Sequence, residues 1–112
     1  MSIRNIKEIG NVTVVELEGR IDIHTSENIG DEMMTLIDKG KKEILYDLSH
    51  LNYLSSSGLR IFVSVRRRLD GLKGRVKICG MNKTIKEIFD IVELTSLYEV
   101  FDNSEEAIKS FS

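Results

Sequence analysis

The chain has 112 residues, of which 30% are charged, and its formal net charge at pH 7 is −2. This length predicts one domain, residues 1–112, which buries roughly two-thirds of the surface exposed by the unfolded chain. The balanced charge argues against a nucleic-acid-binding protein and a membrane-surface protein, because both need a strongly basic face.

No apolar run approaches the roughly 18 residues of a membrane-spanning helix, and no secretory signal follows Met1. Because Cys79 is the single cysteine, no internal disulfide can form, and we expect a cytoplasmic protein.

Strand-like and helical segments alternate along the chain. Strands are predicted at residues 3–9, 12–18, 43–48, 76–79 and 97–101. Gly10-Asn11, between the first two strands, is typical of a tight hairpin turn. Apolar residues at helical spacing predict helices that end at Lys39-Gly40, at Leu69, at Val92 and near the C-terminus.

Residues that favour helix starts precede each predicted helix. The stretch 19–25 is expected to be a loop that leads into the first helix. The predicted N-caps are Thr25 or Ser26, then one of Ser55, Ser56 and Ser57, then Asn82, and finally Asn103 in a capping box with Glu106. A hairpin followed by alternating helices and strands predicts an α/β fold: a single small mixed β-sheet with helices packed against it.

Three consecutive serines and a glycine, Ser55 to Gly58, lie where the second helix begins. One hydroxyl suffices for the N-cap, so two others lie in or beside the first turn. There the free backbone amides and the helix dipole favour a negative charge. A phosphate on one of these serines would add about −1.5 to −2 charges at neutral pH. From the residues alone, two interpretations stay open: a polar cap and loop, or a phosphorylation site.

Two motifs resemble those of the anti-sigma factor antagonists, the bacterial STAS domains. Asp47-Leu48-Ser49 followed by Leu-Ser-Ser-Ser-Gly-Leu at 54–59 resembles the family pattern Asp-Leu-Ser, a short apolar segment and Asp-Ser-Ser/Thr-Gly-Leu. Residues 19–25 resemble the family's Gly-Glu-Leu-Asp-x-x-Thr loop, with Arg20 in place of an acidic residue, and Ser55 replaces the family's Asp. The resemblance covers essentially the whole chain and implies a STAS-like α/β sandwich.

The same resemblance implies a phosphorylation-switched binding protein. In that family, the unphosphorylated domain binds an anti-sigma factor that is itself a serine kinase, and the sigma factor is released. The kinase then phosphorylates a serine that falls on Ser56 here, with Ser55 and Ser57 as alternatives, and a PP2C-type phosphatase resets the switch. The implied partner-binding face consists of Arg20, Asp22, His24, Thr25, Leu54, Ser55, Ser57, Gly58 and Arg60. We expect a monomer or weak dimer with no cofactor and with neither nucleic acid nor membrane as a partner.

Two other functions stay open at this point. One is a scaffold subunit within a larger assembly of STAS domains. The other is a small enzyme that uses Asp22, His24 and the serines, or Asp47 with His50. Because the two histidines lie in separate loops without a recognisable catalytic motif, we expect surface or capping roles for them.

The sequence offers little to a metal ion or a nucleotide. Cys79 and the two histidines lack the paired spacing of zinc ligands, and no glycine-rich phosphate-binding loop occurs. Cys79 is expected to be a small buried hydrophobe. The run Arg66-Arg67-Arg68 is expected to be a solvated helix end, with contact to an acidic partner as the alternative.

Overall fold

The computed structural model describes residues 3–112, in which five strands form one mixed sheet in the order β1-β2-β3-β4-β5. The strands are β1 (Ile3–Ile9), β2 (Val12–Ile21), β3 (Glu43–Leu54), β4 (Arg75–Cys79) and β5 (Glu99–Phe101). β1 and β2 form the antiparallel hairpin that Gly10-Asn11 predicts, and all later neighbours are parallel. The predicted α/β fold with a mixed sheet is therefore confirmed.

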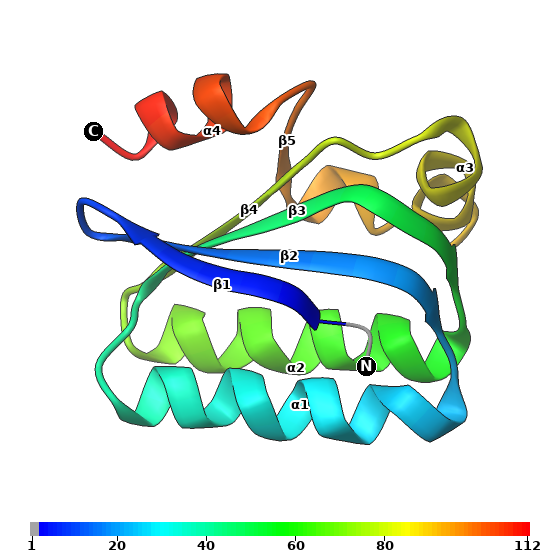
Figure 1. The fold of residues 1–112 in the computed structure, drawn as a ribbon, viewed down its shortest axis with the longest axis horizontal. Coiled ribbons are helices and arrows are strands. Elements are labelled where there is room, and N and C mark those ends of the chain that lie inside the picture. The colour runs from blue at the N-terminus through cyan, green and yellow to red at the C-terminus, as the bar shows by residue number, and fades with distance from the viewer. Residues whose placement is uncertain (1–2) are drawn as a thin grey trace.

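Helices cover both faces of the sheet. They are α1 (Ile23–Asp38), α2 (Ser56–Gly71), α3 (Lys83–Ile91) and α4 (Ser104–Ser110), with a short 3-10 turn η1 (Thr95–Leu97) before β5. α1 and α2 lie side by side beneath one face, α4 lies over the other, and α3 lies at one end of the sheet (Figure 1). Both α1 and α2 begin where β2 and β3 end, so the two motif segments meet at the carboxyl edge of the sheet.

The larger apolar cluster fills the space between the sheet and helices α1, α2 and α3. A series of aromatic rings crosses it, with centroid separations of 4.5 Å for Tyr46–Phe62, 5.6 Å for Phe62–Phe89 and 6.3 Å for Phe89–Tyr98. The Tyr98 hydroxyl donates a hydrogen bond of 2.8 Å to the Phe62 carbonyl, and burial raises the pKa of Tyr98 to about 12. These contacts fix α2 and α3 against the strands that carry the motif segments.

A smaller apolar cluster lies between the opposite face of the sheet and α4. Its buried members are Val12, Val14, Leu45, Cys79, Ala107 and Phe111. Cys79 is fully buried, which confirms its expected role, and burial raises the pKa of its thiol to about 12.

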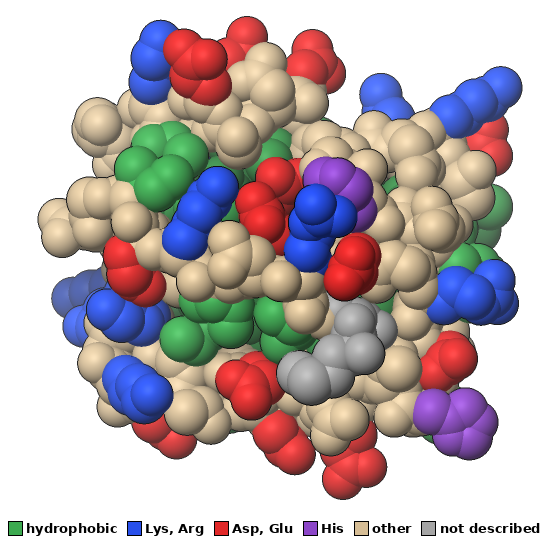
Figure 2. All heavy atoms as spheres, viewed as in Figure 1, with side chains coloured by type: hydrophobic (Ala, Val, Ile, Leu, Met, Phe, Trp, Pro, Cys, Tyr) green, Lys and Arg blue, Asp and Glu red, His purple; other side chains and the backbone are tan. Residues whose placement is uncertain are grey.

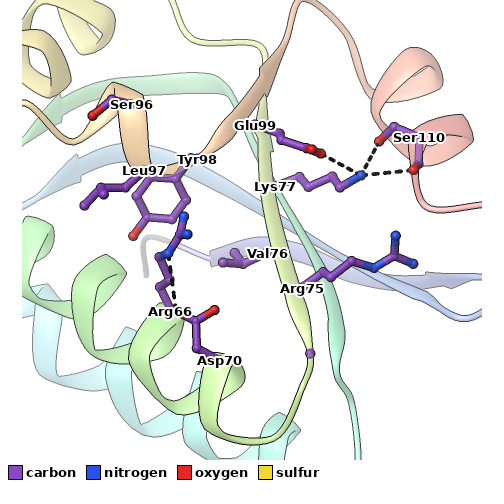
Figure 3. Close-up of a pocket in the computed structure, with 11 residues that line it drawn as sticks. Arg66, Asp70, Arg75, Val76, Lys77, Ser96, Leu97, Tyr98, Glu99 and Ser110 are labelled. Atoms are coloured by element: carbon purple, nitrogen blue, oxygen red, sulfur yellow. Dashed lines mark hydrogen bonds and ion pairs between the residues drawn. The ribbon is translucent and has the colours of Figure 1, made fainter.

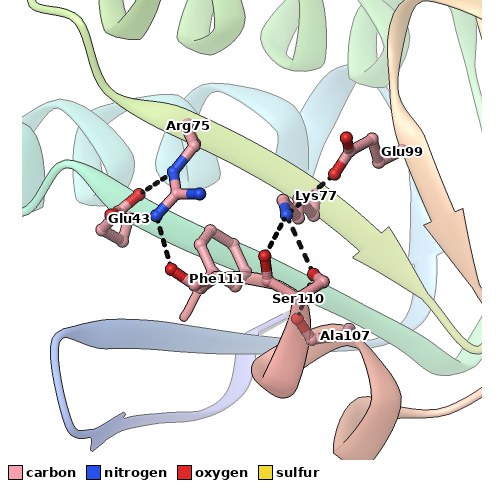
Figure 4. A network of polar contacts seen from close by, with 7 residues as sticks. All are labelled: Glu43, Arg75, Lys77, Glu99, Ala107, Ser110 and Phe111. Atoms are coloured by element: carbon pink, nitrogen blue, oxygen red, sulfur yellow. Dashed lines mark hydrogen bonds and ion pairs between the residues drawn. The ribbon is translucent and has the colours of Figure 1, made fainter.

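Two cations on β4 hold the last turn of α4 over this cluster (Figure 4). Lys77 Nζ donates to the carbonyl and hydroxyl oxygens of Ser110, at 3.0 and 2.9 Å, and pairs with Glu99 at 2.8 Å. The Arg75 guanidinium donates to the Phe111 carbonyl at 2.7 Å. Because the last carbonyls of a helix lack intrahelical partners, these two side chains satisfy groups that the helix itself leaves unpaired.

The start of α1 differs from the prediction. Residues 19–21 continue β2 instead of forming a loop, and the N-cap is Asp22, so the assignment to Thr25 or Ser26 was wrong. Asp22 Oδ1 accepts from the amides of His24 (2.9 Å) and Thr25 (3.2 Å), while the Thr25 hydroxyl accepts from the Asp22 amide (3.1 Å). This reciprocal capping box satisfies two helix-start amides and the cap's own amide, which a cap at Thr25 would leave unpaired.

β3 continues to Leu54, six residues beyond the predicted end. Against β2 it carries extra residues at two places, because Glu16 pairs with Asp47 but Glu18 with His50, and a second shift follows before Arg20. Each shift interrupts the alternation that identifies a strand in the sequence. The predicted strand at 97–101 is likewise shorter, since its first residue, Leu97, ends η1.

Candidate functional site

The two motif segments are joined by backbone hydrogen bonds at the ends of β2 and β3. Ile21 pairs with Leu54, and the Ser55 amide donates to the Ile21 carbonyl at 2.8 Å. Gly58 packs directly on this junction, since a Cβ there would lie 2.4 Å from Leu54 Cδ1 and 2.8 Å from Ile21 Cγ2. A glycine at this position therefore lets the first turn of α2 approach both strands.

The three serines have different environments. Ser55 is the N-cap of α2, and its hydroxyl oxygen accepts from the Gly58 amide at 3.2 Å. Ser57 is half-buried, whereas Ser56 is exposed and its hydroxyl makes no hydrogen bond within residues 3–112. Asp and Ser are both preferred N-caps, so Ser55 in place of the family's Asp can still cap this helix. Ser56 is the serine whose hydroxyl is both exposed and uncommitted.

A shallow cavity of about 460 Å³ adjoins Ser56 and is called the Ser56 groove below. Its lining residues are Ser56, Leu59, Arg60, Val63, Ser64, Arg67 and Val92. The apolar side chains come from α2 and from the residue that follows α3, and Val92 is 45% exposed. The groove was not predicted, although the sequence contains a signal for it: helical spacing places Arg60 and Arg67 on the same face of α2 as Ser56.

Several residues of the predicted partner-binding face serve the fold. Asp22 and Thr25 form the capping box of α1, and the hydrogen bond from the His24 amide is the main cause that lowers the pKa of Asp22. Leu54 and Gly58 are buried, so they position the site from beneath.

Other members of that face lie at the surface. His24 is exposed in the first turn of α1. The Arg20 guanidinium lies 4.4 Å from the centroid of the Tyr53 ring on the neighbouring strand. Arg60 is exposed within the Ser56 groove. The surface seen in Figure 2 intersperses acidic and basic side chains, with acidic groups predominating along α1 at its lower edge.

Asp47, Ser49 and His50 form a small polar cluster at a bulge of β3. The Ser49 hydroxyl donates to Asp47 Oδ1 at 2.7 Å and lies 3.2 Å from His50 Nδ1. The serine lies between the acid and the imidazole, whereas activation of a serine nucleophile needs the imidazole between the other two. Asp47 Oδ1 also accepts a hydrogen bond of 3.0 Å from the Ser49 amide. The Asp-Leu-Ser motif therefore forms a local turn, closed by a side chain, that shapes the strand.

Within residues 3–112, no three His, Cys, Asp or Glu side chains are arranged to hold a metal ion. In the same residues, no helix has both the length and the apolar character needed to cross a bilayer.

A second cavity of about 490 Å³, called the β4–β5 cleft below, lies between the end of α2 and strands β4 and β5 (Figure 3). Its cations all have acidic partners: Arg66 pairs with Asp70 at 3.5 Å, Lys77 with Glu99, and Arg75 with Glu43. In the arginine run, Arg68 pairs with Asp38 of α1, so its side chain links the two helices rather than being only solvated.

The fold and the meeting of the two motif segments define a small α/β domain that presents an exposed serine at the start of a helix. The chain matches the family model of the STAS domain over residues 4–107 and belongs to the STAS domain family. BtrV of Bordetella bronchiseptica, named as a candidate anti-sigma factor antagonist, is 28% identical over 104 residues, which are 93% of this chain and 90% of BtrV.

Further relatives carry related names. The anti-sigma F factor antagonist of Paenibacillus polymyxa is 26% identical over 98 residues, 87% of this chain and 84% of that protein. The Bacillus protein SpoIIAA has been solved in an unphosphorylated form (22% identity, TM-score 0.75) and in a phosphorylated form (24% identity, TM-score 0.78). These structures cover 96% of this chain, and the chain covers 96% and 98% of them, so the likeness in fold extends over both molecules.

Proposed function

We propose that this protein is an anti-sigma factor antagonist of the bacterial cytoplasm, a binding protein and not an enzyme. Its unphosphorylated form binds an anti-sigma factor that is a serine kinase, and the sigma factor is thereby released. The kinase phosphorylates Ser56, the complex dissociates, and a PP2C-type phosphatase restores the binding form. Membership in the STAS family and the names of the relatives support this proposal.

We choose Ser56 as the phosphorylated serine because of its environment. Its hydroxyl is exposed and free of hydrogen bonds within residues 3–112, whereas the Ser55 oxygen is occupied by the Gly58 amide. A kinase must bring the acceptor hydroxyl into its own active site, so an exposed and uncommitted hydroxyl is the suitable acceptor. The rigid strand ends beneath Gly58 hold it in a defined position.

A phosphate on Ser56 would place about −1.5 to −2 charges at the rim of the Ser56 groove. A partner surface that fits the uncharged serine closely must then accommodate a desolvated dianion. A cost of about 3–4 kcal/mol weakens affinity by roughly a few hundredfold to a thousandfold, which suffices for a switch.

The test is peptide mass spectrometry of the full chain after incubation with ATP and a candidate anti-sigma kinase from the same genome. We expect one added phosphate that maps to Ser56. Ser56→Ala should bind the kinase with unchanged affinity but resist ATP-dependent release, and Ser56→Asp should bind poorly. Ser64→Ala is the matched control, because Ser64 is an exposed serine that lines the same groove two turns along α2.

Two outcomes would count against the proposal. Full affinity of Ser56→Asp would show that charge at this position does not control binding. Tight binding without any phosphorylation would favour a scaffold subunit, and size-exclusion chromatography would then show a large assembly instead of the monomer or weak dimer expected for a lone switch.

A further inference from the structure

The arginines of α2 fall into two groups according to their partners. Arg66 pairs with Asp70, and Arg68 pairs with Asp38. Within residues 3–112, Arg60 and Arg67 make no hydrogen bond, ion pair or ring contact, and both are exposed in the Ser56 groove. Their charges are therefore available to another group that enters this groove.

Arg60 lies four residues after Ser56 on the same helix, about 6 Å further along the axis and on the same face. Side chains on a helix lean toward its N-terminus and cover the preceding turn, so Arg60 extends toward Ser56. An anion followed four residues later by a cation is also the favourable order for an ion pair within a helix. Arg67 lies on the same face but about 16 Å from Ser56 along the axis, beyond the reach of its side chain.

We propose that Arg60 is the intramolecular ligand of a phosphate on Ser56, so that phosphorylation withdraws a binding cation from the groove as it adds a dianion. This inference rests on the proposed function for the step that forms the phosphoserine. In that step the γ-phosphoryl group of ATP passes to the Ser56 oxygen, the hydroxyl proton is released and ADP leaves. The guanidinium then donates to the phosphate oxygens in a charge-assisted pair.

The chemistry of the pair gives the two forms of the groove different charges. Without the phosphate, Arg60 and Arg67 offer two guanidinium groups to an acidic group on a partner. With it, Arg60 is engaged within its own helix and a partner's acidic group meets the phosphate instead. Loss of attraction and gain of repulsion thus arise from one covalent change: Arg60 accounts for the lost attraction, and the phosphate charge that Arg60 leaves unneutralised accounts for the repulsion.

The experiment uses full-length protein with phosphoserine installed at position 56 during translation, so that it needs neither kinase nor partner. A ³¹P NMR titration gives the pH midpoint of the phosphate in this protein and in its Arg60→Gln and Arg67→Gln variants. We expect Arg60→Gln to raise the midpoint by about 0.3 of a pH unit, because a nearby cation favours the dianion. Arg67→Gln removes the same charge from the same face and should raise it by less than a third as much.

The comparison isolates the guanidinium, because the amides of the first turn act equally on the phosphate in all three proteins. Equal midpoints in the parent and Arg60→Gln, or equal shifts in the two variants, would overturn the inference. If the midpoints differ as expected but no kinase modifies Ser56, the proposed function fails while the pairing stands. If phosphorylation releases the partner but the midpoints coincide, the pairing fails alone.

Discussion

The β4–β5 cleft and the Ser56 groove both contain arginines, but the arginines have different surroundings. In the β4–β5 cleft, every cation is paired with an acidic side chain, and Lys77 and Arg75 also bind carbonyls at the end of α4. In the Ser56 groove, Arg60 and Arg67 have no such partners within residues 3–112 and flank apolar side chains.

This difference separates charges that hold the fold from charges that are available for recognition. A paired cation that satisfies a helix end contributes to stability, and its donors have little left to offer a ligand. An unpaired cation beside exposed apolar surface contributes little to stability but can contribute to binding. The larger of the two cavities is therefore the one we assign to structure.

Replacing Lys77 gives the largest expected effect on stability. Lys77 is only 5% exposed and donates to both Ser110 oxygens, so Lys77→Ala leaves a part-buried carbonyl without its donor. We expect a loss of about 2 kcal/mol in the free energy of unfolding and a decrease of about 8 °C in Tm. Urea unfolding and calorimetry would measure both quantities.

The affinity of Lys77→Ala for the partner tests whether Lys77 serves stability and not binding. Lys77→Ala should bind the anti-sigma kinase within about twofold of the parent affinity, because it lies outside the Ser56 groove. Lys109→Ala is the control, since Lys109 also pairs with a glutamate but is exposed at the surface. That variant should change stability by less than about 0.5 kcal/mol. A large loss of binding in Lys77→Ala would contradict the division between the two cavities.

Replacing Val92 tests whether the Ser56 groove serves binding and not stability. Val92 lines the Ser56 groove and is 45% exposed, so Val92→Ser removes apolar surface that a partner would bury. We expect roughly a fivefold loss of affinity for the kinase, which corresponds to about 1 kcal/mol, with little change in Tm. Isothermal titration calorimetry measures the affinity.

Leu72→Ser is the matched control for Val92→Ser. Leu72 has a similar exposure, 40%, but lies at the opposite end of α2 from Ser56. It should leave the affinity unchanged. Equal losses in the two variants would mean that the groove is not the docking surface.

The fold follows from the sequence because its signals are local and repeated. Apolar spacing identifies α1 to α3, and the pair Gly10-Asn11 identifies the hairpin. The error at the start of α1 has a specific cause: Asp22, Thr25 and Ser26 are all good caps, and only the reciprocal bonds of a capping box distinguish them. The second half of β3 was missed because its shifts against β2 interrupt the alternation of side chains.

The site was only partly predictable. Sequence reasoning placed the serines at a helix start, and the resemblance selected Ser56, but neither distinguishes exposed from occupied hydroxyls. The Ser56 groove depends on Val92, which lies more than thirty residues after Ser56 in the sequence. The pairing of Lys77 with the end of α4 also depends on tertiary contacts, and the sequence presents that residue only as one polar position in an alternating strand.

The smallest expected effect is an acid-dependent one in the β4–β5 cleft. The hydrogen bond from Lys77 lowers the pKa of Glu99, so this carboxylate stabilises the fold above its unfolded pKa and the contribution is lost as the pH falls through the lowered value. Because Glu99 is largely exposed, we expect this carboxylate to contribute only about 0.5 kcal/mol to the free energy of unfolding.

The Tm of Glu99→Gln should therefore fall less than the Tm of the parent when the pH is lowered from about 5 to about 3. The decrease should not vanish, since the pKa of Asp22 is also lowered, by the amides of the α1 cap, and its contribution has the same sign. A Tm that depends on pH equally in Glu99→Gln and the parent would show that the Lys77–Glu99 pair adds nothing, and that Lys77 stabilises the fold only through its contacts with Ser110.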